Sequence, residues 1–152
     1  MSSAYDEPAS FTPDGISHRG VRADPSEIAL LRGSMRRWLA QLPLNDDCRQ
    51  DILLASYEAL ANAVEHAYAP GDPAATLDFE AIYRPADGRL HVLVTDHGVW
   101  HDASDDESRR SRGHGLTLIR NLTSEMTVDR SPGGTVVDMR WSLNENDTSD
   151  VH

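Results

Sequence analysis

The stretch Glu58-Ala-Leu-Ala-Asn62-Ala-Val-Glu65-His66-Ala-Tyr68 decides how the rest of this sequence is interpreted. It closes a longer segment whose apolar residues recur at helical spacing, which predicts an amphipathic helix. Glu58 and Asn62 are one helical turn apart, and Glu65 and His66 follow a turn later, so these polar side chains project to roughly one side. A solvated polar face explains the pattern, and so does a functional site. Asparagine is a poor helix former, so its position inside a predicted helix needs an explanation.

Length and composition indicate one globular domain. The chain has 152 residues, of which 39% are hydrophobic and 26% charged, enough to bury a substantial core. No apolar run approaches the ~20 residues that cross a bilayer, and the N-terminus lacks the basic and apolar regions of a secretory signal. A single cysteine, Cys48, excludes an internal disulfide and a multi-cysteine metal site. We therefore expect a cytoplasmic protein.

The charged residues exclude several functions. A net charge of −11 argues against nucleic-acid binding by the surface as a whole and leaves basic or mixed-charge protein partners open. All 14 basic residues counted as Lys or Arg are arginines. The lack of lysine excludes a P-loop, a eukaryotic-type protein kinase and lysine Schiff-base chemistry. If this protein binds ATP, it must do so without a lysine.

The first part of the chain predicts a leader, a strand and a helix. Residues 1–13 are rich in Ser, Pro and acidic residues and are predicted to be a disordered leader. Residues 15–22 predict a short strand. Asp24 followed by proline and serine is a helix start signal, and this helix is expected to end near Leu42. Its apolar stripe does not include Arg32, Arg36 and Arg37. These arginines form either a solvated surface or a face that docks a partner.

The middle and the end of the chain predict a long helix and a sheet. The long helix is expected to begin at a cap, Asn45 or Asp46, and to end near Tyr68. Alternating side chains over residues 76–83 and 90–95 predict an antiparallel hairpin. Further expected elements are a mobile loop over 101–112, a short helix over 116–122, strands over 125–129 and 135–141, and a polar tail over 144–152.

The order of these elements predicts the fold class. Helices separate from a mainly antiparallel mixed sheet and cover one face of it, which makes an α+β protein with a two-layer α/β sandwich. The domain is expected to occupy residues 14–143.

Two glycine-bearing stretches add to the long helix. Asp96-x-Gly98 directly follows a predicted strand, and Gly113-x-Gly115 precedes the short helix. Glycines before a helix N-terminus let backbone N–H groups converge on an anion, although alone they more often mark a turn. The second stretch is not the dinucleotide fingerprint, because Leu118 stands where that motif has glycine.

Taken together, these pieces resemble the GHKL superfamily of ATPases and kinases, and within it the bacterial anti-sigma-factor serine kinases. They occur in the order of that family, and the resemblance covers roughly residues 15–143. There is one departure: Trp100 replaces a second glycine of the first glycine box, where it either closes over the nucleotide or packs the base of the lid. The matching pieces are Glu58-x-x-x-Asn62-Ala63-x-x-His66-Ala67-Tyr68 (N box), Asp96-x-Gly98 (first glycine box), Arg112-Gly113-x-Gly115-Leu116 (second glycine box) and Gly134-Thr135.

The resemblance implies a domain that binds ATP and Mg²⁺. Asn62 would hold the ion through its amide oxygen, and Glu58 would be the general base for an attacking hydroxyl. Asp96 would accept a hydrogen bond from the adenine amino group. The other implied cofactor-binding residues are Gly98 near the base, Gly113, Gly115 and Leu116 at the phosphates, Thr135 supporting the adenine contact, and Arg112 supplying phosphate charge.

The function that the resemblance implies is an ATP-dependent serine protein kinase and anti-sigma factor. It would phosphorylate a small anti-anti-sigma (STAS-type) partner and sequester a sigma factor. An alternative is a nucleotide-binding interaction module without phosphotransfer; Glu58 argues against it and Trp100 for it. A general ATPase or chaperone would need further domains. Kinases of this family commonly form homodimers, for which the first helix and its preceding strand are the candidate interface.

Overall fold

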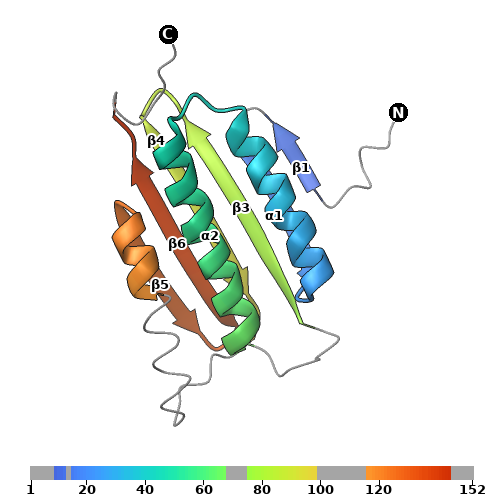
Figure 1. Ribbon diagram of the computed structural model, residues 1–152. Coiled ribbons are helices and arrows are strands. Elements are labelled where there is room, and N and C mark those ends of the chain that lie inside the picture. The colour runs from blue at the N-terminus through green and yellow to red at the C-terminus, as the bar shows by residue number, and fades with distance from the viewer. Residues whose placement is uncertain (1–8, 13–14, 68–74, 99–115, 145–152) are drawn as a thin grey trace, which may run out of the picture.

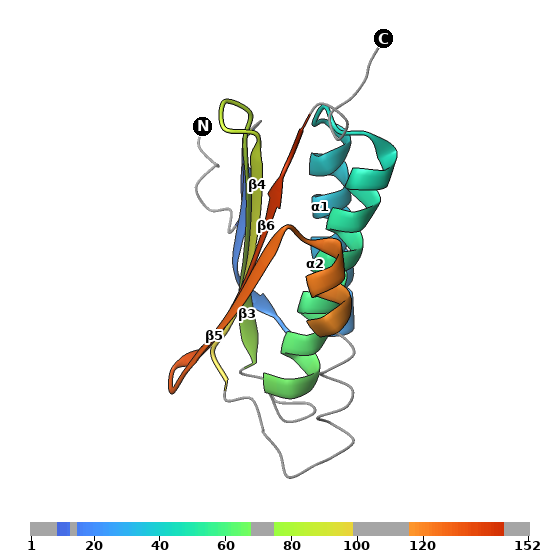
Figure 2. The same ribbon diagram turned by 90° about the vertical axis from the view of Figure 1, so that its left-hand side faces the viewer.

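A six-stranded sheet forms one layer of the molecule and the helices form the other (Figures 1 and 2). The computed structural model describes residues 9–12, 15–67, 75–98 and 116–144. The strand order is β1-β2-β3-β4-β6-β5, and each neighbouring pair is antiparallel. The predicted two-layer α+β sandwich is confirmed. The expected mixed character is not found over the described strands, whose neighbouring pairs are antiparallel throughout.

The described elements follow the predicted ones closely. The helix α1 stops two residues before the predicted end at Leu42, because Pro43 disfavours a helical backbone in the residue before it. The elements are β1 (Ala9–Thr12), β2 (Gly15–Arg22), α1 (Pro25–Ala40), α2 (Asp46–Ala67), β3 (Thr76–Arg84), β4 (Arg89–Asp96), β5 (Glu125–Ser131), β6 (Gly134–Ser142) and a short helix over residues 116–122.

The strand β1 corrects the prediction of a disordered leader for residues 9–12, and the rest of that predicted leader lies outside the described residues. Ala9–Thr12 pairs with β2 in an antiparallel register that places Ala9 opposite His18. Four residues are too few to show an alternating pattern, and an edge strand takes its hydrogen bonds from its neighbour. The local sequence therefore carries little signal for this strand.

Both long helices begin at the caps that the sequence predicts. The Asp24 carboxylate accepts a hydrogen bond from Glu27 N at 3.0 Å, and Asn45 Oδ1 accepts one from Cys48 N at 2.8 Å. Each bond satisfies an N–H group that has no partner inside its helix. Cys48 is buried and free of disulfides, as expected of an ordinary packed thiol.

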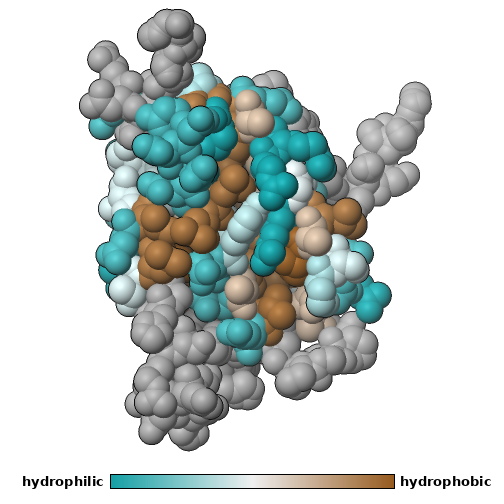
Figure 3. All heavy atoms as spheres, viewed as in Figure 1, coloured by the Kyte–Doolittle hydropathy of each residue, from teal (hydrophilic) through white to brown (hydrophobic). Residues whose placement is uncertain are grey.

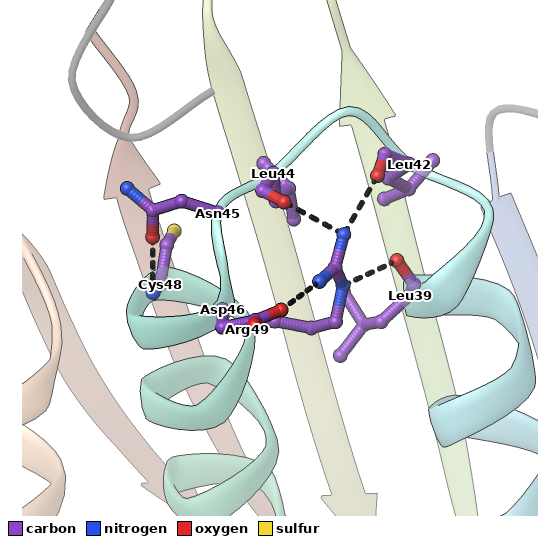
Figure 4. Close-up of polar contacts among 7 residues, drawn as sticks. All are labelled: Leu39, Leu42, Leu44, Asn45, Asp46, Cys48 and Arg49. Carbon is purple, nitrogen blue, oxygen red and sulfur yellow. Dashed lines mark hydrogen bonds and ion pairs between the residues drawn. The ribbon is translucent and has the colours of Figure 1, made fainter. Parts of the chain in front are cut away.

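The guanidinium of Arg49 holds the connection between α1 and α2 (Figure 4). Its Nε donates to Leu39 O at 3.1 Å, and its Nη2 donates to Leu42 O at 3.0 Å and Leu44 O at 2.7 Å. These carbonyls belong to the end of α1 and the turn after it, where intrahelical donors run out. One side chain therefore fixes the path of the chain from α1 into α2.

The core lies between the helices and one face of the sheet. Buried and half-exposed residues alternate along β3, β4 and β6, as expected when one face is covered. Small α2 residues face this sheet, which lets the helix approach closely. The residues with 0–1% exposure include Trp38, Leu39, Ile52, Ala55, Ala59, Ala63, Leu77, Phe79, Val92 and Met139.

The side that carries the helices is mostly hydrophilic, with hydrophobic surface gathered over the short helix at residues 116–122 (Figure 3). In that helix Ile119 is fully buried, and Leu116 and Leu122 are half-buried against the core. None of the helices formed by the described residues is long and apolar enough to span a membrane.

Candidate functional site

The C-terminal half of α2, the end of β4 and the start of β6 meet at one end of the molecule. α2 packs against β4, and β4 runs antiparallel to β6, so the last residue of one strand lies beside the first residues of the other. In Figure 1 this is the lower end of the sheet. Glu58, Asn62, Asp96 and Thr135, which are far apart in sequence, thus belong to one end of the fold.

Asn62 is a buried polar residue of α2 with a side-chain donor that is unsatisfied within the described part of the chain. Its side chain is 4% exposed, and its Nδ2 has no hydrogen-bond partner among the described residues. Leaving a buried amide unsatisfied costs about 1–3 kcal/mol, and such groups are few in native proteins. A group outside the described residues, either bound or from the chain itself, is needed to satisfy this amide.

Glu58 precedes Asn62 by one helical turn and is half-buried. The flank of α2 that carries this pair is not the flank that packs on α1, where the Arg32 guanidinium lies 4.8 Å from the ring centre of Tyr57. Asp51 shares the Glu58 flank by helical spacing, and it borders a pocket of about 330 Å³ together with residues 121–124, at the end of the short helix and just after it. The pair therefore faces the side of the short helix.

Asp96 ends β4 as a buried carboxylate with 2% exposure. It accepts a hydrogen bond from Gly98 N at 3.1 Å, and a carboxylate can accept several hydrogen bonds at once. Thr135, also 2% exposed, stands directly opposite it in β6. Burying a carboxylate is costly unless hydrogen bonds stabilise it, so this position is a candidate for a functional role.

Gly134 adjoins the candidate site, and the sequence does not reveal its structural role. Its φ is +147°, and a Cβ built on it would lie 2.0 Å from the backbone oxygen of Asp96. Only glycine permits such a close approach, because it has no Cβ. The first residue of β6 therefore contacts the backbone of Asp96. The Gly133-Gly134 pair predicts a turn, but no local pattern indicates which backbone the second glycine touches.

Part of the predicted site lies outside the described residues. This applies to Arg112, Gly113 and Gly115, and to Trp100. Leu116, the first residue of the short helix that the structure describes, is half-buried and packs against the core. The roles proposed for the second glycine box therefore stay predictions.

The chemistry of the described groups fits a magnesium-bound adenine nucleotide. A side-chain amide offers the neutral oxygen that Mg²⁺ accepts, and this ion commonly takes one or two protein ligands and completes its shell with phosphates and water. A buried carboxylate suits an exocyclic amino group, which is a hydrogen-bond donor. The amide oxygen of the buried Asn62 and the buried carboxylate of Asp96 would supply these two groups at one end of the fold. The Asn62 atom without a partner among the described residues is Nδ2, a hydrogen-bond donor and not a metal ligand.

A two-layer sandwich with a buried asparagine on its long helix and a buried aspartate at a strand end defines an ATP-binding domain of the GHKL type. The family model for the histidine kinase-like ATPase domain matches residues 21–141. The chain belongs to this family.

Several curated relatives are protein kinases. The chain is 25% identical over 129 residues to the serine-protein kinase RsbW of Staphylococcus aureus, covering 76% of this chain and 80% of that one. It is 28% identical over 109 residues to the serine/threonine-protein kinase BtrW of Bordetella bronchiseptica, covering 63% and 75%. The chain is thus homologous to the RsbW serine-protein kinases, and its histidine kinase-like ATPase domain implies ATP binding.

A solved structure confirms the fold. The RsbU and RsbW domains of Rv1364c from Mycobacterium tuberculosis superpose with a TM-score of 0.67 at 23% identity over 90% of this chain. The match spans 34% of the length of that solved chain, so it bears on this domain alone.

Proposed function

We propose that this protein is an ATP-dependent serine kinase and anti-sigma factor, which phosphorylates a serine of an anti-anti-sigma partner and sequesters a sigma factor. The observation that carries the proposal is the buried Asn62 amide, unsatisfied within the described structure and one turn from Glu58. A domain that only bound protein partners would not need a carboxylate beside such an amide. The kinase names of the relatives support the same activity.

Each described residue has a stated task in this proposal. Bound Mg-ATP supplies the phosphoryl group. Asn62 holds the ion through its amide oxygen, and the buried Asp96 accepts the adenine amino group with support from Thr135 opposite it. Glu58 accepts the proton of the attacking serine hydroxyl. Positioning and electrostatic stabilisation carry most of phosphoryl transfer, so a fixed helix is a suitable carrier for two of these groups.

The proposal extends to the groups that the sequence alone indicates. Gly98 borders the base, Gly113, Gly115 and Leu116 border the phosphates, and Arg112 adds positive charge there. The protein is proposed to act in the cytoplasm as a homodimer that uses β2 and α1 at its interface.

The test is phosphate transfer from Mg-ATP to a purified serine-bearing anti-anti-sigma protein. Glu58→Gln should lower the transfer rate by about 10²- to 10⁴-fold, the range for loss of a general base, and leave nucleotide affinity within about twofold. Glu80→Gln is the matched control, because Glu80 is also half-buried but lies on the uncovered face of the sheet. Transfer that survives Glu58→Gln would remove Glu58 from its role.

Nucleotide selection is tested separately. Asp96→Asn replaces an acceptor by a group that also donates, so ATP should bind about 10- to 100-fold more weakly, the range for a lost hydrogen bond to a charged group. If wild-type protein binds ATP but transfers no phosphate to any serine partner, the interaction module without phosphotransfer becomes the better description. Equal affinity for ATP and GTP would contradict the assignment of Asp96.

A further inference from the structure

A second pocket lies on the face of the sheet that the helices leave uncovered. It has a volume of about 250 Å³ and sits beside the β3–β4 turn, at the upper end in Figure 1 and therefore away from the candidate nucleotide site. Along β3 and β4 the residues that line it alternate with the buried ones, which places them on the uncovered face. The pocket residues used below are Ile82, Arg84, Asp87, Arg89, His91 and Arg140.

Two arginines of this pocket face each other without a direct acidic partner among the described residues. Arg84 and Arg89 are direct cross-strand partners in the register of β3 and β4. Like charges in such a position are unfavourable. Neither guanidinium has a hydrogen bond or ion pair with another residue of the described ranges. Asp87, in the turn between them, is the acid among the lining residues.

The third arginine is already neutralised. Asp138 accepts hydrogen bonds from Arg140 Nε and Nη2, both at 3.2 Å, and its Oδ1 lies 2.6 Å from His91 Nε2. This network fixes one wall of the pocket. Positive charge therefore remains at Arg84 and Arg89, on a chain whose net charge is −11.

We infer that this pocket, defined by Arg84, Arg89 and Ile82, docks an acidic peptide segment of a protein partner. Guanidinium groups bind carboxylates through paired N–H donors, and Ile82 offers an apolar floor for the stem of a glutamate. The volume is below the ~300–1,000 Å³ of sites that enclose small molecules. Two arginines are also too few for nucleic acid, whose binding rests on many phosphate contacts. The inference goes beyond the proposed function and does not depend on it.

The experiment titrates the full chain with an octapeptide of alternating Glu and Ser, followed by NMR shifts of backbone amides at low ionic strength. Shifts should concentrate on residues 82–91 and 140. The double variant Arg84→Ala/Arg89→Ala should bind about tenfold more weakly, as expected for two charge-assisted contacts. The matched control Arg37→Ala/Arg120→Ala removes the same charge from exposed helical positions and should bind within about twofold of wild type.

Three outcomes would overturn the inference. The first is equal binding of the peptide in which Gln replaces Glu, and the second is equal weakening by the control variant. The third concerns residues 145–152 of this chain, which are acidic and follow Leu143, whose N–H donates to Gly88 O in the β3–β4 turn at 2.7 Å. If neutralising Glu145, Asp147 and Asp150 tightens peptide binding severalfold, the occupant is this chain's own tail; unchanged affinity supports a partner.

Discussion

Gly134 lies against the backbone carbonyl of Asp96, so that a Cβ on the glycine would stand 2.0 Å from the aspartate oxygen. The contact joins the start of β6 to the end of β4, immediately beside the register pair Asp96 and Thr135. The backbone that carries the buried carboxylate is therefore placed by a residue without a side chain.

Gly134→Ala should disturb both stability and nucleotide binding. The added methyl group requires the strands to separate, and φ of +147° is strained for any residue with a Cβ. We expect a loss of about 1–3 kcal/mol in the free energy of unfolding, measured by urea denaturation, with weaker ATP binding. Gly133→Ala is the control, because a Cβ there meets nothing within 4 Å. Equal effects of the two substitutions would refute the contact.

Asn62→Leu should separate function from stability. Because Nδ2 of Asn62 is buried without a partner among the described residues, replacing the amide with an apolar group removes an unsatisfied donor. Stability to urea should stay equal or rise, while Mg²⁺-dependent ATP binding, measured by calorimetry, is lost. Ser56→Ala provides the comparison, since its buried hydroxyl on the same helix also lacks a partner in the described structure but should not affect ATP. A marked loss of stability in Asn62→Leu would show that the amide has a structural role.

Arg49→Ala should destabilise the link between the two long helices. The substitution removes the guanidinium hydrogen bonds to the carbonyls of Leu39, Leu42 and Leu44, although Leu39 O and Leu42 O each keep one backbone N–H donor. We expect a loss of about 2–3 kcal/mol from charge-assisted hydrogen bonds. Thermal and urea unfolding measure it. Asp46→Ala removes the exposed ion-pair partner of Arg49 and should cost less than about 1 kcal/mol. If both variants lose the same stability, the ion pair and not the carbonyl contacts would matter.

His18 should make stability depend on pH. Burial lowers the pKa of His18 below its ordinary value, and its Nε2 lies 2.9 Å from Ser34 Oγ. As pH falls below about 6.5, the unfolded chain binds a proton that the folded chain does not yet accept, so stability decreases. Above that pH both states are neutral at this residue. His18→Gln should reduce the loss of stability between pH 7.5 and 5.5 in urea titrations; an unchanged slope would contradict the prediction.

The helices were predictable because their signals are local. The caps at Asp24 and Asn45 act on N–H groups three residues away, and helical periodicity repeats within each segment. The hairpin of β3 and β4 follows equally from its alternation and its turn. β1 was missed because its hydrogen bonds depend on β2 and not on its own residues.

The sequence by itself determined the two long helices, the hairpin and the one-turn spacing of Glu58 and Asn62, since these depend on residues within a few positions of one another. Only the tertiary structure decided that Asp96 stands opposite Thr135, that Gly134 touches the Asp96 backbone, that the Asn62 amide is unsatisfied by its described neighbours, and that Arg84 faces Arg89. The reason is that strand order, register and burial arise from packing between distant segments, where many pairings satisfy the same local pattern.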